Sequence, residues 1–96
     1  MQLAGRVAVV TGGAGGIGKA ICKRFGQEGM KVVAADLDAA ALDAAVEELR
    51  TEALDVTGVA VDVTQRESVE SLRDAAVDAY GAVHIVCNNA GIANTA

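Results

Sequence analysis

A run of glycines between Thr11 and Gly18 is the part of this 96-residue sequence best suited to chemistry. It reads TGGAGGIG, and Gly13, Gly15 and Gly18 fit the spacing G-x-G-x-x-G. Backbone N–H groups approach a pyrophosphate closely only where no Cβ intervenes. A helix N-terminus that follows such a loop adds unpaired donors and partial positive charge. The loop therefore predicts a binding site for the phosphates of a dinucleotide.

The same glycines nearly fit a second kind of phosphate loop. Gly13, Gly18 and Lys19 satisfy G-x-x-x-x-G-K, but Ala20 stands where that motif requires a hydroxyl to bind Mg²⁺. A nucleoside triphosphatase is therefore disfavoured, and Lys19 is interpreted as a solvated helix residue. A glycine turn without a ligand is the other alternative. So many glycines, however, lower the stability of the fold through chain entropy, and a turn alone gives no reason for that cost.

Asp36 is the second candidate, and it decides between cofactors. It ends an apolar run eighteen residues after Gly18, where a carboxylate that accepts both hydroxyls of the adenosine ribose is expected. A 2′-phosphate would remove a hydrogen bond and bring like charges together. No Arg or Lys stands at positions 13–15 or 37 to neutralise it. We therefore predict NAD rather than NADP. Asp36 could instead cap a helix, although Asp38 could do so alone.

Four short apolar runs and three segments with helical periodicity must position these residues. The runs, rich in β-branched residues, are 7–10, 32–35, 59–61 and 83–87; short runs without alternation are typical of strands covered on both faces. The helical segments carry the apolar sets 17, 21, 25; 42, 45, 46, 49, 53; and 69, 72, 76, 80. Strand–helix alternation predicts an α/β domain with parallel pairing and right-handed crossovers.

Composition excludes several classes of protein. Hydrophobic residues make up 52% and charged residues 22% of the chain, as in ordinary globular proteins. The net charge of −5 and the lack of a basic cluster argue against a nucleic-acid surface. No apolar run is long enough for a membrane span and no secretory signal pattern is present, so we expect a cytoplasmic protein. Cys22 and Cys87 lack metal-ligand spacing and are interpreted as reduced core thiols, without a metal site.

Two motifs together resemble the short-chain dehydrogenase/reductase family, and the resemblance covers the whole chain. Thr11, Gly12, Gly16 and Gly18 match the TGxxxGxG cofactor motif of the main branch of that family. The glycines also satisfy the TGxxGxxG motif of the extended branch. Residues 88–91 read NNAG, a main-branch feature at the end of the fourth strand, and this settles the ambiguity.

The resemblance implies the N-terminal half of an NAD(P)-binding Rossmann fold, β-α-β-α-β-α-β, with parallel strand order 3-2-1-4. That order leaves the strand near 83–87 as an apolar edge, which invites association with another chain. Asp62 would bind the adenine amine and the Val63 backbone a ring nitrogen, although Asp62 could instead belong to the start of the next helix. Asn88 and Asn89 would stabilise the sheet, and the backbone of residues 89–91 would approach the riboses.

The predicted cofactor-binding set combines these inferences. Its members are Gly12, Gly13, Gly15, Gly16, Ile17, Gly18, Asp36, Leu37, Asp62, Val63, Asn88, Asn89, Ala90 and Gly91.

The catalytic residues of the resembled family have no counterpart in this sequence. Its members use a Ser, a YxxxK pair and an Asn on the fourth helix, and the Tyr acts as general acid/base. Here the only tyrosine, Tyr80, is followed four residues later by His84, and both serines precede the NNAG strand. No residue is therefore assigned a catalytic role. We expect residues 1–96 to be a partial dinucleotide-binding domain, truncated before the catalytic half and inactive alone.

The activity implied by the resemblance is hydride transfer between a nicotinamide cofactor and an alcohol or carbonyl substrate. The complete enzyme is expected to be a homodimer or homotetramer. A nucleotide-binding module without catalysis is the main alternative. An S-adenosylmethionine-dependent methyltransferase is less favoured, because its loop usually follows an acidic residue rather than Thr11 and it gives no reason for NNAG.

Overall fold

A computed structural model describes residues 3–62 and 66–88, with only the backbone described at residues 66–69 and 88. Its four parallel strands are β1 (Val7–Thr11), β2 (Lys31–Asp36), β3 (Val56–Ala60) and β4 (Ile85–Asn88). The helices between them are α1 (Gly16–Gln27), α2 (Ala39–Thr51) and α3 (Arg66–Tyr80). The strands are ordered β3-β2-β1-β4, which confirms the predicted α/β class and strand order.

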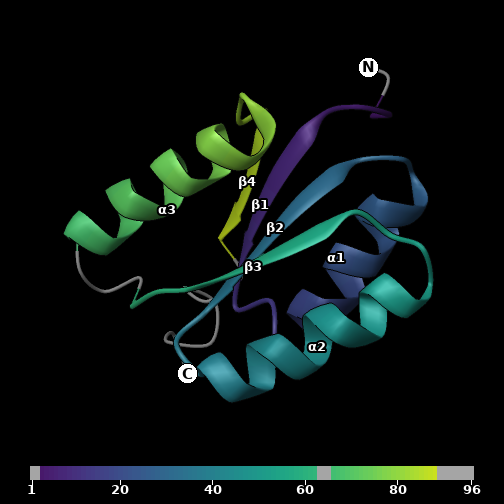
Figure 1. The fold of residues 1–96 in the computed structure, drawn as a ribbon, viewed down its shortest axis with the longest axis horizontal. Coiled ribbons are helices and arrows are strands. Elements are labelled where there is room, and N and C mark those ends of the chain that lie inside the picture. The colour runs from purple at the N-terminus through teal and green to yellow at the C-terminus, as the bar shows by residue number, and fades with distance from the viewer. Residues whose placement is uncertain (1–2, 63–65, 89–96) are drawn as a thin grey trace.

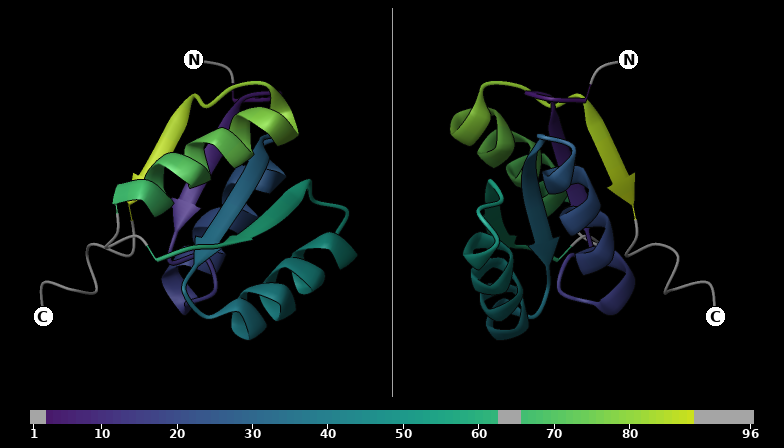
Figure 2. Two further views of the ribbon diagram at one scale, coloured as in Figure 1. Left: turned by 60° about the vertical axis from the view of Figure 1, so that its left-hand side comes forward. Right: turned by 90° about the vertical axis from the view of Figure 1, so that its right-hand side faces the viewer.

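The elements form three layers, with α1 and α2 on one face of the sheet and α3 on the other (Figures 1 and 2). Every residue of β1 is buried, and so are the four central residues of β2. Strands covered on both faces need apolar side chains at every position. This double coverage explains why these two strands were recognisable as uninterrupted apolar runs.

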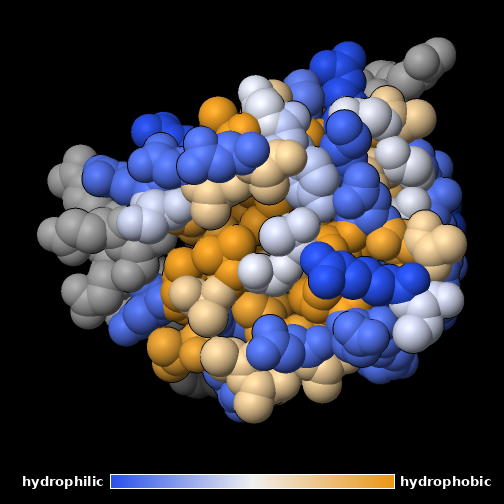
Figure 3. Space-filling model, in the orientation of Figure 1, coloured by the Kyte–Doolittle hydropathy of each residue, from blue (hydrophilic) through white to orange (hydrophobic). Residues whose placement is uncertain are grey.

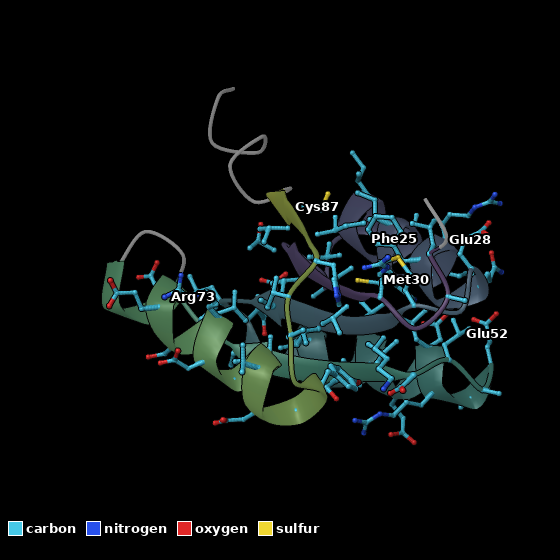
Figure 4. The ribbon with its side chains drawn as sticks, turned by 90° about the horizontal axis from the view of Figure 1, so that it is seen from above. Phe25, Glu28, Met30, Glu52, Arg73 and Cys87 are labelled. Atoms are coloured by element: carbon cyan, nitrogen blue, oxygen red, sulfur yellow. The ribbon has the colours of Figure 1, made fainter. Side chains whose placement is uncertain are left out.

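Most of the core lies between the sheet and the α1–α2 layer. Met30, Leu42 and Leu49 are among its largest fully buried side chains. Figure 4 shows Phe25 and Met30 close together in this layer, and Phe25 packs against the same cluster. The smaller cluster under α3 is built from Val9, Val33, Ala35, Leu72 and Ala76.

The helix predictions hold for most of α2 but not for its last apolar position or for the phase of α1. Four of the residues predicted to form the apolar face of α2 are buried: Leu42, Ala45, Val46 and Leu49. The fifth, Ala53, lies beyond the end of the helix and is exposed. In α1 the buried residues are Gly18 and Cys22, and Ile17 is 69% exposed. The expected apolar line through Ile17 is therefore wrong at its first position, because the buried stripe of α1 begins one residue later.

The third strand begins earlier than predicted. The register pairs Val32 with Val56 and Asp36 with Ala60, so β3 starts three residues before the apolar run at 59–61. Thr57 and Gly58 hid its first half, since polar residues and glycine weaken the sequence signal of a strand. Only the first residue of β3 is fully buried, because this strand lies at one edge of the described sheet.

Replacing Ala53 by glycine should raise the free energy of unfolding by about 0.5–1 kcal/mol. Ala53 follows Glu52, the C-cap of α2, and has a φ of +62°. This left-handed conformation costs an L-residue about 1–2 kcal/mol, part of which glycine loses again through its freer unfolded chain. Urea denaturation measures the change. The control, Ala44→Gly within α2, should lower stability by about 1 kcal/mol, and a loss of stability in Ala53→Gly would contradict this account.

Candidate functional site

The carboxyl ends of the parallel strands lie together at one end of the sheet, and the predicted residues gather there. Thr11 at the end of β1 lies in register with Ala35 in β2 and Asn88 in β4. Asp36 ends β2 and lies in register with Ala60 of β3. In open α/β sheets, ligands bind at the carboxyl ends of the strands. The fold therefore brings the glycine loop and Asp36 together.

Two glycines of the loop between β1 and α1 are explained by the backbone conformation and the packing of the loop. Gly12 has a φ of +68°, a conformation that favours glycine. The Gly13 N–H donates to Ala35 O at 2.9 Å, so the loop lies directly against β2. A Cβ at position 13 would lie 2.9 Å from the Cβ of Ala34 and 3.2 Å from its Cα. No side chain fits there without a shift of the loop or of β2.

The next two glycines have no such reason in the described chain. Gly15 is the N-cap of α1 with a φ of −75°, and a Cβ there would meet only Gly12 O at 3.6 Å. A Cβ on Gly16, the first residue of α1, would meet no described protein atom within 4 Å. These two glycines thus leave open space over the start of α1.

The start of α1 can hold an anion. No side chain forms a capping hydrogen bond at Gly15, and the first turn carries no acidic residue. The first turn of a helix has N–H groups without intrahelical partners, together with partial positive charge. Backbone donors beneath a surface without Cβ atoms are the arrangement that binds phosphate. Gly18 is buried in the same helix, as expected for a glycine that allows close packing on the sheet.

Asp36 connects the loop to the sheet through its carboxylate. Its Oδ2 accepts from the Ala14 N–H at 3.0 Å and its Oδ1 from the Asp38 N–H at 3.3 Å. Asp38, not Asp36, caps α2, since its carboxylate accepts from the Ala41 N–H at 3.1 Å. The capping alternative for Asp36 is therefore wrong. A carboxylate accepts about four hydrogen bonds, so Asp36 keeps capacity for a ligand.

Ala14 is a member of the site that the sequence did not reveal. Its N–H donates to Asp36 rather than remaining open, and its side chain packs against the core cluster on the α1 face. Neither fact has a sequence signal beyond the position of Ala14 between two glycines. The hydrogen bond becomes visible only once β1 and β2 are neighbours.

Other predicted residues fall at the same edge or outside the described part. Asp62 is half-buried just after Val61, whose N–H donates to Asp36 O at 2.9 Å. Ile17 and Leu37 are 69% and 71% exposed and add apolar surface near the loop and Asp36. The structure places the backbone of Asn88 at the end of β4. The remaining predicted residues lie outside the described residues: Val63, Asn89, Ala90 and Gly91.

Tyr80 and His84 lie at the opposite end of the sheet, where the strands begin, and have structural roles. The Tyr80 hydroxyl donates to Asp55 Oδ1 at 2.8 Å and lies 2.9 Å from Thr57 Oγ1, beside the start of β3. The Val7 N–H donates to His84 Nδ1 at 2.9 Å, where β1 begins. These contacts place both side chains at the amino ends of the strands. Neither side chain is in reach of the glycine loop as an acid or base.

Lys19 points toward α2 rather than toward the loop. Its ammonium group forms an ion pair with Glu48, and the Lys19 N–H donates to Gly15 O within the helix. The triphosphate-loop alternative needs this ammonium on a phosphate, so the geometry disfavours it further. Among residues 3–62 and 66–88, no three His, Cys, Asp or Glu side chains gather as a metal site would require. No described helix is long and apolar enough to cross a membrane.

The Cys22 thiol should react with a disulfide reagent about a hundredfold more slowly in the folded protein than in urea. Cys22 is fully buried, and Cys87 packs against the same cluster. Burial, together with repulsion from Cys87, raises the pKa of Cys22 to about 12, so the reactive thiolate is scarce at pH 8. Thiol titration of a Cys87→Ala variant isolates Cys22. Equal rates with and without urea would contradict the burial.

Comparison with known proteins supplies the family. Residues 6–96 match the sequence family described as short chain dehydrogenase. The chain belongs to the short-chain dehydrogenase family. It is 48% identical over 92 residues to 1-deoxy-11-beta-hydroxypentalenate dehydrogenase of Streptomyces exfoliatus. The aligned residues cover 96% of this chain and 34% of that protein. The chain is also 48% identical over 90 residues to 3beta-hydroxysteroid dehydrogenase 2 of Eggerthella lenta, covering 94% of this chain and 35% of that protein.

Solved structures of short-chain dehydrogenases have the same fold as this chain. A short-chain dehydrogenase/reductase from Burkholderia phymatum, in complex with NAD, superposes with a TM-score of 0.87 at 41% identity, over 90% of this chain and 31% of that one. A short-chain dehydrogenase from Mycobacterium smegmatis gives a TM-score of 0.88 at 34% identity, over 92% and 38%. The chain thus spans about a third of the length of the relatives it matches.

Proposed function

We propose that this chain is the cofactor-binding part of an NAD-dependent short-chain dehydrogenase/reductase. The complete protein would transfer hydride between the nicotinamide and an alcohol or carbonyl carbon of a small molecule. The observation that carries the proposal is the open start of α1. Beside the Asp36 carboxylate, Gly15 and Gly16 place no side chain over the N–H groups of this turn, and the described residues give neither glycine a packing reason. The similar proteins named as dehydrogenases support the same activity.

Each end of the dinucleotide has residues that fit it. The backbone of the loop, at Gly15 and Gly16, would hold the pyrophosphate, and the Asp36 carboxylate would accept the hydroxyls of the adenosine ribose. Leu37 and Ile17 would offer their exposed apolar surfaces to the flat rings. The bound cofactor supplies the carbon that accepts or donates the hydride.

The remaining contacts follow from the family motifs. Asp62 and the Val63 backbone would bind the adenine, Asn88 and Asn89 would support the end of β4, and the backbone at Asn89, Ala90 and Gly91 would approach the riboses. Gly12, Gly13 and Gly18 would shape the loop without covering it. In this proposal residues 1–96 position the cofactor, and the proton transfer is carried out by residues outside this sequence.

The preference for NAD over NADP rests on charge. Asp36 is only half-buried and directs its carboxylate toward the loop, through Ala14. A phosphate on the ribose would lie against this negative charge. Positions 13–15 and 37 provide no cation to offset it. These features support NAD as the cofactor.

Assembly and location are extensions of the same proposal. We expect a cytoplasmic homodimer or homotetramer that acts on a small molecule.

The direct test is to read the coding frame past codon 96 and to assay the protein it encodes. If the frame continues into a Ser and then a YxxxK pair, the purified protein should reduce NAD with members of a panel of secondary alcohols. A stop codon at that point would overturn the enzymatic function. NAD binding by the 96-residue protein would then favour the non-catalytic module, and absence of NAD binding would overturn that function as well.

A further inference from the structure

We propose that the groove between α2 and the outer edge of β3 binds an extended peptide strand that carries a lysine or arginine. The groove contains a cavity of about 240 Å³ that is open to solvent. Its lining residues are Asp43, Val46, Glu47, Arg50, Thr57 and Gly58. None of these residues belongs to the candidate cofactor site. The inference therefore stands apart from the proposed dehydrogenase function.

Part of the backbone of β3 has no hydrogen-bond partner along this groove among residues 3–62 and 66–88. The Val32 N–H donates to Asp55 O and the Val61 N–H to Asp36 O, both at 2.9 Å, and these bonds fix which residues of β3 face β2. In a parallel ladder, alternate residues direct both backbone groups toward the same neighbour. The residues of β3 that direct their N–H and C=O groups away from β2 are therefore Val56, Gly58 and Ala60.

One contact confirms that direction. The Arg50 Nε–H donates to Val56 O at 2.8 Å from outside the sheet, so α2 already covers the first outward carbonyl. Gly58 and Ala60 follow along the edge, and both are exposed. An open strand edge of this kind accepts a further strand through backbone hydrogen bonds.

The side chain opposite Gly58 would enter the cavity. A Cβ on Gly58 would point toward α2, 3.0 Å from Val46 Cγ2 and 3.3 Å from Leu42 Cγ. In paired strands, directly opposite residues project from the same face. The residue opposite Gly58 would therefore project toward α2 as well, beside Val46 and toward the cavity that Val46 and Gly58 line.

The charges of the groove select the side chain. The cavity is lined by two acids, Asp43 and Glu47, and one cation, Arg50, so its negative charge exceeds its positive charge. The Arg50 Nε–H is already bonded to Val56 O, and the two acids form no ion pair with another residue in 3–62 or 66–88. In the view of Figure 3, hydrophilic side chains of α2 border apolar surface beside β3. A long cationic side chain satisfies both features, with its stem on Val46 and its charge on the acids. A second copy paired antiparallel about Gly58 would put glycine there and leave both acids unpaired.

The test uses two fluorescein-labelled peptides, acetyl-TVKVT-amide and acetyl-TVEVT-amide, and fluorescence anisotropy with the intact protein. The lysine peptide should bind at least about tenfold more tightly than the glutamate peptide. Asp43→Lys should weaken binding of the lysine peptide by about tenfold. Asp74→Lys on α3 changes the net charge equally and should leave binding unchanged. Hydrogen exchange at residues 56–60 should slow when the lysine peptide is bound.

Several results would overturn the proposal. They are equal affinity for the two peptides, an equal loss in the Asp43 and Asp74 variants, and no binding of the lysine peptide at millimolar concentration. Protection of residues 56–60 that rises with protein concentration, without peptide and together with a doubled mass, would instead assign the edge to a second copy. Glu47→Gln serves as a milder variant if Asp43→Lys fails to fold, and it should also weaken binding.

Discussion

Replacing Asp36 by alanine should weaken NAD binding by about 10- to 100-fold and should strengthen NADP binding. The carboxylate would make charge-assisted hydrogen bonds to the ribose, worth about 1.5–3 kcal/mol, and tenfold in affinity corresponds to about 1.4 kcal/mol. Removing its negative charge also removes the repulsion of a 2′-phosphate. Calorimetric titration of the protein with each cofactor measures both effects.

Asp38→Ala is the matched control for this experiment. It removes the same charge two residues away and deletes the cap of α2, so stability should fall by about 1 kcal/mol while the ratio of NAD to NADP affinity stays constant. If Asp36→Ala weakened both cofactors equally, its role would be limited to holding the Ala14 N–H. If NAD affinity did not change, Asp36 would not contact the ribose.

Two substitutions in and directly after the loop between β1 and α1 should have separate effects, one on cofactor binding and the other on folding. Gly16→Ala should weaken NAD binding at least about tenfold without loss of stability, because its new methyl group meets no described protein atom and occupies the space proposed for the pyrophosphate. Gly13→Ala should lower stability by about 1–3 kcal/mol, since its methyl group would lie 2.9 Å from the Cβ of Ala34. Thermal melts without cofactor and NAD titrations measure the two effects independently.

The outcome for Gly16→Ala bears directly on the proposed function. NAD binding equal to that of the unmodified protein would mean that the open start of α1 is not the pyrophosphate site. A drop in stability as large as that of Gly13→Ala would mean that Gly16 is glycine for reasons of packing.

The strands that were easiest to predict are those that are buried along most of their length. β1 and β2 are covered on both faces, so their apolar runs mark them closely. At the edge, β3 is buried at one residue only, and Thr57 and Gly58 removed the signal from its first half. Helix phase also escaped prediction, because Ile17 lies on the expected stripe by spacing yet projects outward in the first turn of α1.

The candidate site was predictable to the extent that it follows from strand ends. A loop after the first strand and an acid after the second must meet when the strands are parallel neighbours, which placed Gly13 and Asp36 together. The contact between Asp36 and the Ala14 N–H, and the different reasons for Gly13 and Gly16, depend on tertiary distances. Spacing alone treats all these glycines alike.

The hydrogen bond from the Ala14 N–H to Asp36 has a consequence for how a ligand would arrive. It holds the loop against β2 in the free chain, with Gly13 bonded to Ala35 on the same side. A ligand that meets a loop already fixed loses less free energy to ordering it. The carboxylate proposed to recognise one end of the dinucleotide thus also preorganises the backbone that would recognise its centre.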